Sequence, residues 1–329
     1  MNLSLPRLFL FICLLTACER AQFKDQVTQT YGLADRSSEY RALVSKNPKE
    51  LSGEQLYNRT LTLWDIPYRE LKLPTSNGSA HVLVSGPVDG KPIVLLHGMS
   101  VDSTMWYPNI KALSEHYRVY AIDDIWGAGK STPSHEDTEI TTLVAWYFEV
   151  FELLQLQQIN LIGASQGGWI ATNLALSAPE RFDTLVLLSP AQTITWLEPS
   201  LDILANMWFK LNPERDGLED NLETLSSRVE NIDILYKDRF FSTIKNEPRS
   251  PILLDMQPFN DAQLSRLSMP VLLLVGDDDL VNDLDTVQQA NKILPNVQAE
   301  IIQESGHFIN ADQADLVNRK ILAFLKNES

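Results

Sequence analysis

One serine stands where a nucleophile for acyl transfer is expected. Ser165 is the central residue of a G-x-S-x-G pattern at 163–167, which directly follows the apolar run 159–162 and precedes a stretch of helical length. In a tight turn between a strand and a helix, minimal flanking side chains let the serine hydroxyl stand out at the helix N-terminus. The alternative is an ordinary serine that caps a helix. Because both glycines and the preceding strand are present, the pattern favours a nucleophile.

A base and a carboxylate that could activate this serine lie near the C-terminus. A neutral imidazole can take the hydroxyl proton, and a carboxylate can orient that imidazole. The chain has 5 histidines, and only His307 follows Ser165. Three consecutive acids, Asp277, Asp278 and Asp279, precede it. These acids could instead bind calcium, although they lack the spacing and the glycine of an EF-hand loop. We expect one of them to act with His307, and we expect no metal and no cofactor.

Apolar runs that alternate with helical stretches predict the scaffold that positions these residues. The runs lie at 93–96, 119–122, 159–162, 185–188 and 271–275. Runs that are apolar on both faces suit a buried parallel sheet. Strand–helix alternation indicates a doubly wound α/β fold. A hairpin is expected around Asn77-Gly78, and a helix is expected over 314–324, where apolar residues recur on one face.

The chain divides into a leader, a tether, a core and an insertion. We expect a signal peptide at 1–17, a lipidated N-terminus and tether at 18–60, and a core formed by 61–190 and 265–329. The remaining segment, 191–264, is longer than a crossover needs and shows no strand alternation. It is therefore expected to form a helical cap, with most of its aromatic residues in the core of that cap.

The first eighteen residues predict a membrane anchor. One charge, Arg7, precedes an apolar run that is too short to span a bilayer. The run ends in L-T-A-C, which resembles the lipoprotein box whose cysteine, here Cys18, is lipidated and becomes the N-terminus. A plain signal peptide with a coincidental cysteine is the alternative. Since Glu19 is not the aspartate typical of inner-membrane retention, we expect anchoring in the cell envelope, at the outer membrane or periplasmic face if the cell has two membranes.

The charge balance of the chain argues against nucleic-acid binding. Lys and Arg total 27 against 43 Asp and Glu, which gives a net charge of −16. A chain this acidic is a poor candidate for binding a phosphate backbone. The expected partners are a small-molecule ester substrate and, through the lipid anchor, a membrane, but no nucleic acid. The oligomeric state is left open.

Four stretches match, in chain order, the pattern of the α/β-hydrolase superfamily. Residues 93–99 resemble its strand and His-Gly loop, 124–131 resemble its D-x-x-G-x-G-x-S loop, and the serine motif is the third match. The fourth is 271–279, which resembles the strand ending in G-x-x-D, followed by Gly306-His307. The resemblance covers most of the predicted core. It implies an α/β-hydrolase fold, which is a mostly parallel, doubly wound sheet of about eight strands with a helical cap. Within this superfamily, the chain resembles bacterial carboxylesterases.

The resemblance implies a role for each residue of the site. In the family's order of serine, acid and histidine, Ser165 is the nucleophile, Asp279 is the acid and His307 is the base. The backbone N–H groups of Met99 and Gln166 form the oxyanion hole. The implied reaction is the hydrolysis of carboxylic esters through an acyl-enzyme on Ser165.

Other functions share the same residues. A lipase, a thioesterase and an aminopeptidase use this triad and differ in the cap, and acyl transfer to an alcohol remains open. A non-catalytic, lipid-tethered binding protein would need a broken catalytic position, and the sequence has none. Outside the triad, we expect His97 to support the oxyanion loop and Asp124 to structure its own loop. The other histidines are expected at the surface or at an edge: His81, His116 and His135.

Overall fold

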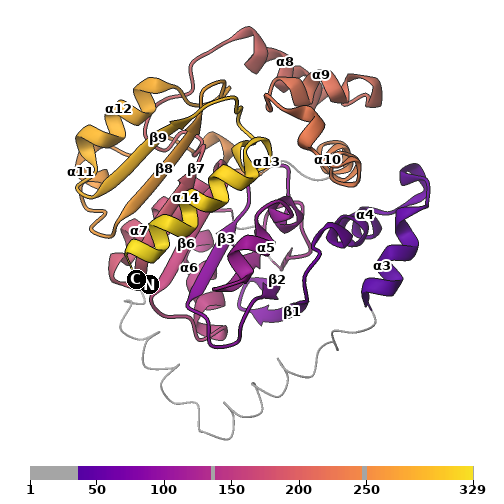
Figure 1. The fold of residues 1–329 in the computed structure, drawn as a ribbon, viewed down its shortest axis with the longest axis horizontal. Coiled ribbons are helices and arrows are strands. Elements are labelled where there is room, and N and C mark those ends of the chain that lie inside the picture. Colours follow the sequence, from indigo (N-terminus) through magenta and orange to yellow (C-terminus); the bar gives the residue numbers. More distant parts are fainter. Residues whose placement is uncertain (1–35, 135–137, 247–249, 329) are drawn as a thin grey trace, which may run out of the picture.

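The computed structural model describes residues 36–134, 138–246 and 250–328 (Figure 1). The predicted signal peptide, Cys18 and His135 lie outside these residues. Within the described ranges, none of the helices combines the length and the apolar character needed to cross a bilayer.

A nine-stranded sheet lies at the centre of the molecule, in the order β1-β2-β4-β3-β6-β7-β8-β9, with the short β5 paired to β2. Pairing from β4 to β9 is parallel, whereas β1–β2, β2–β4 and β2–β5 are antiparallel. The strands are β1 (Tyr68–Thr75), β2 (Gly78–Ser85), β3 (Pro92–Leu96), β4 (Arg118–Ile122), β5 (Thr132–Pro133), β6 (Ile159–Ala164), β7 (Phe182–Leu188), β8 (Val271–Gly276) and β9 (Val297–Ile302). The predicted α/β-hydrolase sheet, mostly parallel and of about eight strands, is confirmed.

The local patterns in the sequence explain these strands. All five apolar runs are strands, and every residue of β6 and β8 is buried. The β1–β2 hairpin turns through Ser76 and Asn77, and Gly78, the first residue of β2, has a φ of +128°. A Cβ at this position would lie 2.0 Å from the carbonyl oxygen of Thr132. Both the backbone conformation of residue 78 and its close contact with the backbone of Thr132 therefore require glycine.

Helices cover both faces of the sheet (Figure 1). One apolar core contains residues of α6, α7, α11 and α12, and the other contains residues of α5 and α14. In α14 the predicted apolar face is buried through Val317, Ile321 and Phe324. The helices of these layers are α5 (Ile110–Ser114), α6 (Ile140–Leu153), α7 (Gln166–Ser177), α11 (Asp261–Leu264), α12 (Leu284–Ile293), α13 (Ile309–Asp312) and α14 (Ala314–Asn327).

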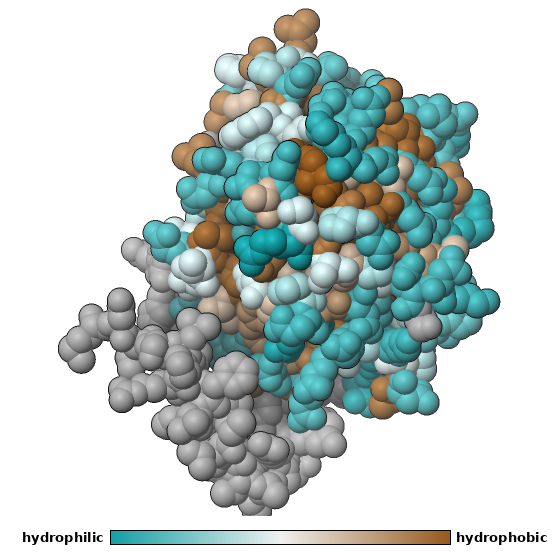
Figure 2. Space-filling view, turned by 90° about the vertical axis from the view of Figure 1, so that its left-hand side faces the viewer, coloured by the Kyte–Doolittle hydropathy of each residue, from teal (hydrophilic) through white to brown (hydrophobic). Residues whose placement is uncertain are grey.

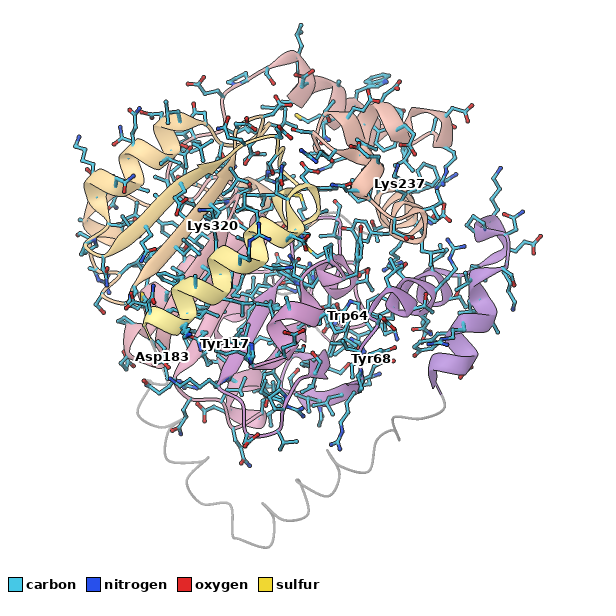
Figure 3. All side chains as sticks on the ribbon, in the orientation of Figure 1. Trp64, Tyr68, Tyr117, Asp183, Lys237 and Lys320 are labelled. Atoms are coloured by element: carbon cyan, nitrogen blue, oxygen red, sulfur yellow. The ribbon has the colours of Figure 1, made fainter. Side chains whose placement is uncertain are left out.

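The later part of the expected tether is folded onto the body. It forms α3 (Arg36–Val44) and α4 (Gly53–Thr60). Arg59 of α4 is buried and pairs with Asp238 of a cap helix, and the Thr60 hydroxyl donates to the Leu235 carbonyl, 3.1 Å away. Figure 3 shows Trp64 next to Tyr68 at the start of β1. Residues 36–60 are therefore part of the folded body, so any free tether is shorter than the predicted 18–60.

The chain between β7 and β8 forms helices above the carboxyl ends of the parallel strands (Figure 1). They are α8 (Leu201–Leu211), α9 (Leu218–Glu223) and α10 (Ile234–Asn246). Some aromatic residues of this segment are buried and others are exposed. Phe209 and Phe240 are buried, whereas the indoles of Trp196 and Trp208 are exposed, so the expectation that they lie in the core holds for only some of them. In Figure 2, hydrophobic side chains reach the surface at the top of the molecule, the level at which Figure 1 places α8.

Candidate active site

Ser165 lies in a strained turn between β6 and α7. Its φ of +52° is a conformation that residues with a side chain rarely adopt. Two close backbone approaches maintain the turn. A Cβ at Gly163 would lie 2.3 Å from the Gly167 carbonyl oxygen, and one at Gly167 would lie 2.2 Å from the Leu96 carbonyl oxygen. The two glycines of the motif are therefore needed for packing, and the turn leaves Ser165 partly exposed.

Three predicted side chains meet in one hydrogen-bonded chain. The Ser165 Oγ lies 2.8 Å from His307 Nε2, and the Asp279 Oδ1 lies 2.8 Å from His307 Nδ1. Because a carboxylate can only accept, Nδ1 carries a proton and donates to Asp279. In the neutral ring Nε2 is then free to accept the proton of the serine hydroxyl. The arrangement can therefore move a proton from Ser165 to His307.

The local environment keeps Asp279 ionised. Burial by itself would raise the pKa of its carboxyl, but attraction to His307 and hydrogen bonds hold that pKa below its ordinary value. The Val281 N–H donates to Oδ1 at 2.9 Å, and the Asn282 amide donates to Oδ2 at 3.0 Å. The carboxylate is thus fixed in position on both oxygens, and its charge faces the imidazole.

The two neighbouring acids have other partners. The Asp277 carboxylate accepts from the Ser305 N–H at 3.0 Å, and the Asp278 carboxylate accepts from the Ser227 hydroxyl at 3.3 Å. Both side chains are exposed. Within the described ranges, no group of three or more histidine, cysteine or acidic residues is arranged to hold a metal ion. Of the three candidates, Asp279 is therefore the one that contacts His307.

The two predicted oxyanion-hole amides border a common cavity. In the described part of the chain, neither the Met99 nor the Gln166 N–H donates a hydrogen bond. Both residues line a cavity of about 350 Å³ beneath the cap. Gly98 brings the Met99 loop against the serine, because a Cβ at Gly98 would lie 3.3 Å from the Ser165 Cβ. The amides are therefore available to a substrate oxygen.

His97 and Asp124 hold the backbone of two loops. The His97 Nδ1 lies 2.8 Å from the Gly98 carbonyl, and its Nε2 accepts from the Asp124 N–H at 2.9 Å. The Asp124 carboxylate accepts from the Trp126 N–H and from the Tyr147 hydroxyl. Burial raises the pKa of Asp124. Neither ring nitrogen of His97 contacts the serine, and both contacts support the loop that leads to Met99.

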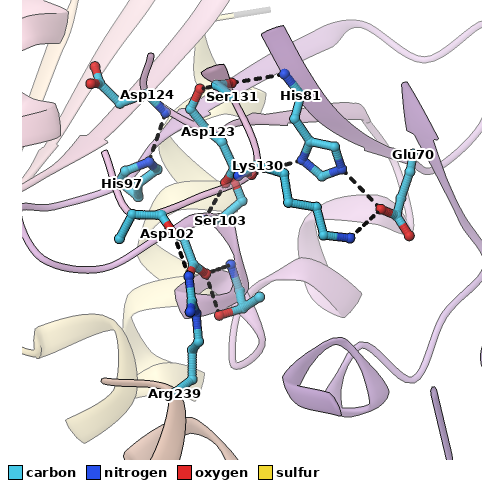
Figure 4. Close-up of polar contacts among 12 residues, drawn as sticks. Glu70, His81, His97, Asp102, Ser103, Asp123, Asp124, Lys130, Ser131 and Arg239 are labelled. Carbon is cyan, nitrogen blue, oxygen red and sulfur yellow. Dashed lines mark hydrogen bonds and ion pairs between the residues drawn. The ribbon is translucent and has the colours of Figure 1, made fainter. Parts of the chain in front are cut away.

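The prediction that His81 lies at the surface or an edge is wrong. Its side chain is buried, with Nδ1 2.8 Å from Asp123 and Nε2 3.0 Å from Glu70 (Figure 4). The Lys130 ammonium lies 2.8 Å from Glu70, and the Asp123 carboxylate also accepts from the Ser103 N–H. Since the surrounding residues of β2 are apolar on both faces, the sequence contained the signal that this histidine is buried.

Charges in this cluster stabilise one another. Burial would lower the pKa of His81, but hydrogen bonds to Asp123 and Glu70 raise it above its ordinary value. Burial would likewise raise the pKa of Asp123, yet its bond to His81 holds it well below the usual range. This buried cluster thus joins β1, β2 and the loop after β4 beside the oxyanion loop.

Among the other histidines, His116 is exposed as expected.

Arg239 of α10 ties the cap to the same loop, and the sequence analysis missed it. Its Nε donates to the buried Asp102 carboxylate at 2.7 Å, and its guanidinium also donates to the Ala128 carbonyl (Figure 4). The Thr243 hydroxyl donates to the Ser100 carbonyl at 2.6 Å. The cap therefore holds residues 100–102, which directly follow the Met99 amide.

Comparison with known proteins agrees with this geometry. A family model described as alpha/beta hydrolase fold matches residues 91–215. Two proteins of Bacillus subtilis (strain 168), uncharacterized carboxylesterase nap and carboxylesterase YbfK, are each 31% identical to the chain. The alignments cover 84% and 82% of this chain and 92% of each relative.

A solved structure is similar over the same extent. The crystal structure of naproxen esterase (carboxylesterase NP) from Bacillus subtilis has a TM-score of 0.77 and 31% identity, over 84% of this chain and 99% of that one. The sheet order, the serine turn and these relatives lead to one conclusion. The chain belongs to the α/β-hydrolase superfamily, among its carboxylesterase-like members.

Proposed function

We propose that the chain hydrolyses carboxylic esters through an acyl-enzyme on Ser165. The observation that carries this proposal is the continuous hydrogen-bonded chain from Asp279 through His307 to the serine hydroxyl. Met99 and Gln166, which lie beside this serine and whose N–H groups donate no hydrogen bond in the described part of the chain, border a cavity. The carboxylesterases named above support the ester as the substrate.

The geometry supports a two-step reaction. His307 Nε2 takes the hydroxyl proton as the Ser165 Oγ attacks the ester carbonyl, and the negative oxygen is bound by the Met99 and Gln166 N–H groups. One such donor typically contributes about 3 kcal/mol to transition-state stabilisation. The imidazolium, stabilised by Asp279, then gives its proton to the departing alcohol. Water repeats the sequence on the acyl-serine, which releases the acid and regenerates the serine.

Replacing the nucleophile tests the proposal directly. Ser165→Ala is expected to reduce kcat for 4-nitrophenyl butyrate by a factor of about 10⁴ or more. Ser177→Ala, at the exposed end of the same helix, is the matched control and should retain activity. A fluorophosphonate should label the wild type at Ser165. Turnover that persists in Ser165→Ala would refute the mechanism, and a wild type that neither labels nor hydrolyses esters would favour a binding protein.

The acyl group and the leaving group are tested with a panel of substrates. The panel consists of esters of rising acyl length, a thioester and an aminoacyl arylamide, all of which the same triad chemistry can cleave. We expect esters of short acyl chains to have the highest kcat/KM, because the cavity of about 350 Å³ is small. A sharp rise in activity at a lipid interface would favour a lipase, and a preference for the arylamide would favour an aminopeptidase.

We also propose that Cys18 is lipidated and anchors the protein in the cell envelope. The support is the L-T-A-C sequence at the end of the short apolar run. Metabolic labelling with an alkyne fatty acid should modify the wild type and Cys13→Ser, but not Cys18→Ser. Equal labelling of Cys18→Ser, or release of the wild type without detergent, would exclude the anchor.

A further inference from the structure

Two lysines line the otherwise largely uncharged cavity beside the serine. Lys210 comes from α8 and Lys245 from the end of α10. They share the cavity with the apolar side chains of Met207 and Leu211, and with the Met99 loop. A cavity of about 350 Å³ is of the size that one small ligand fills. A substrate with its carbonyl at the oxyanion amides therefore occupies the space that these ammonium groups border.

In the part of the chain that the structure describes, neither cavity lysine has a counter-ion, although the Lys245 ammonium lies 5.7 Å from the ring centroid of Phe241. Within the described ranges the Lys210 ammonium forms no ion pair or hydrogen bond, whereas Lys237 of α10 pairs with Glu219 at 2.8 Å. Lys210 is partly buried, and burial lowers the pKa of its ammonium group. Removing an ammonium from water without a partner costs free energy, so buried charges in proteins are normally paired. The Lys210 ammonium is only partly buried and still reaches water, and because it borders the cavity, an anionic group of a ligand can replace that water.

The carboxylate that borders the same cavity does not fill this role. Asp124 is part of the lining, but its two oxygens accept from the Trp126 N–H and the Tyr147 hydroxyl. The general field of the protein does not attract anions either, because the net charge is −16. Selectivity for an anion would thus have to arise locally, from the lysines inside the cavity.

On the premise that the chain is an esterase acting through Ser165, we propose that Lys210, assisted by Lys245, binds a negatively charged group of the substrate. The substrate class is then an ester that carries a carboxylate in its acyl or its alcohol part. The carboxylate forms a charge-assisted hydrogen bond with the Lys210 Nζ while the ester carbonyl lies at the Met99 and Gln166 amides. Lys210 is a specificity-determining residue and takes no part in bond cleavage.

The test compares charged and neutral esters of equal length on the full chain. One pair, 4-nitrophenyl hydrogen adipate and 4-nitrophenyl methyl adipate, differs in the acyl part. The other, 4-carboxyphenyl butyrate and 4-(methoxycarbonyl)phenyl butyrate, differs in the alcohol part. For each pair the ratio of kcat/KM, charged over neutral, is measured for the wild type, Lys210→Met, Lys210→Arg and Lys210→Glu. Lys292→Met, on the exposed face of α12, is the matched control.

One charge-assisted hydrogen bond corresponds to a change of about 10- to 100-fold. We therefore expect Lys210→Met to lower the ratio of at least one pair by that factor, Lys210→Glu to lower it further, and Lys210→Arg to restore most of it. Lys292→Met should leave the ratio unchanged. As a second measurement, free adipate should inhibit hydrolysis of the neutral ester by the wild type at least about 10-fold more strongly than by Lys210→Met.

Two results would overturn the proposal in distinguishable ways. If hydrolysis depends on Ser165 but Lys210→Met leaves both ratios and the inhibition by adipate unchanged, Lys210 does not bind the substrate's charge and the esterase mechanism stands. If Ser165→Ala retains hydrolysis of the neutral esters, the premise itself fails, whatever the lysine variants show.

Discussion

Replacing Asp279 by asparagine separates the position of this side chain from its charge. The Oδ1 atom accepts two hydrogen bonds, from His307 Nδ1 at 2.8 Å and from the backbone N–H of Val281 at 2.9 Å. Oδ2 accepts from the Asn282 side-chain amide, which can turn its own oxygen toward a new donor. An asparagine amide at 279 therefore keeps its oxygen toward His307, since the opposite orientation would place its NH₂ against two donors. His307 then retains its Nδ1 proton and its ability to accept from Ser165.

The expected loss in Asp279→Asn is electrostatic. During the reaction His307 becomes an imidazolium, and two unit charges about 4 Å apart attract by about 4 kcal/mol at an effective dielectric constant of about 20. The amide dipole retains part of this attraction, so kcat should fall by about 10²- to 10³-fold. Asp279→Ala also removes the group that orients the ring, and should cost about 10⁴-fold.

The assay is single-turnover acylation with 4-nitrophenyl butyrate at constant pH. Asn282→Ala is the matched partner. Alone it removes one hydrogen bond from the Asp279 carboxylate, and it should lower the rate by less than about 10-fold. Combined with Asp279→Asn, it removes the competing amide and should not lower the rate further. The reasoning fails if Asp279→Asn loses as much activity as Asp279→Ala, which would mean that the amide had turned, or if it retains wild-type activity.

Two further predictions concern stability. A Cβ at Gly163 would lie 2.3 Å from the Gly167 carbonyl oxygen. Gly163→Ala should therefore lower the free energy of unfolding by about 1–3 kcal/mol, measured by urea titration. An unchanged midpoint of urea unfolding would contradict the close approach. His81 has a raised pKa through its bonds to Asp123 and Glu70, so its stabilisation is complete below the unfolded pKa of about 6.5 and is lost as pH rises through the folded pKa. The difference in unfolding free energy between wild type and His81→Gln should therefore be larger at pH 5.5 than at pH 9, and a difference independent of pH would refute this.

Features set by neighbours in the chain were predictable from the sequence. The apolar runs became strands, the 3.6-residue period became α14, and the Asn77-Gly78 signal marked the β1–β2 hairpin, whose turn is Ser76-Asn77. The serine turn also belongs to this class, because two glycines directly after an apolar strand are a local requirement of its geometry. The patterns themselves lie in short stretches of sequence, so they can be read locally. The close contacts that require Gly78 and Gly167, with Thr132 and Leu96, come from distant parts of the chain.

Features that join distant segments were decided by the tertiary structure. Three adjacent acids could have served His307, and only the path of the chain after β8 directs Asp279, rather than Asp277, toward the ring. Arg239 meets Asp102 across 137 residues, and no local pattern marks either as a partner of the other.

The sequence alone thus determined the fold class, the serine turn and a short set of candidate partners, since these follow from side-chain size and apolar period. The tertiary structure decided which acid contacts His307, which residues the cap adds to the cavity, which carboxylates pair with His81 and why Lys210 has no counter-ion. The physical reason is that the pairing of a buried charge depends on the residues that pack around it. Segments far away in the chain contribute those residues.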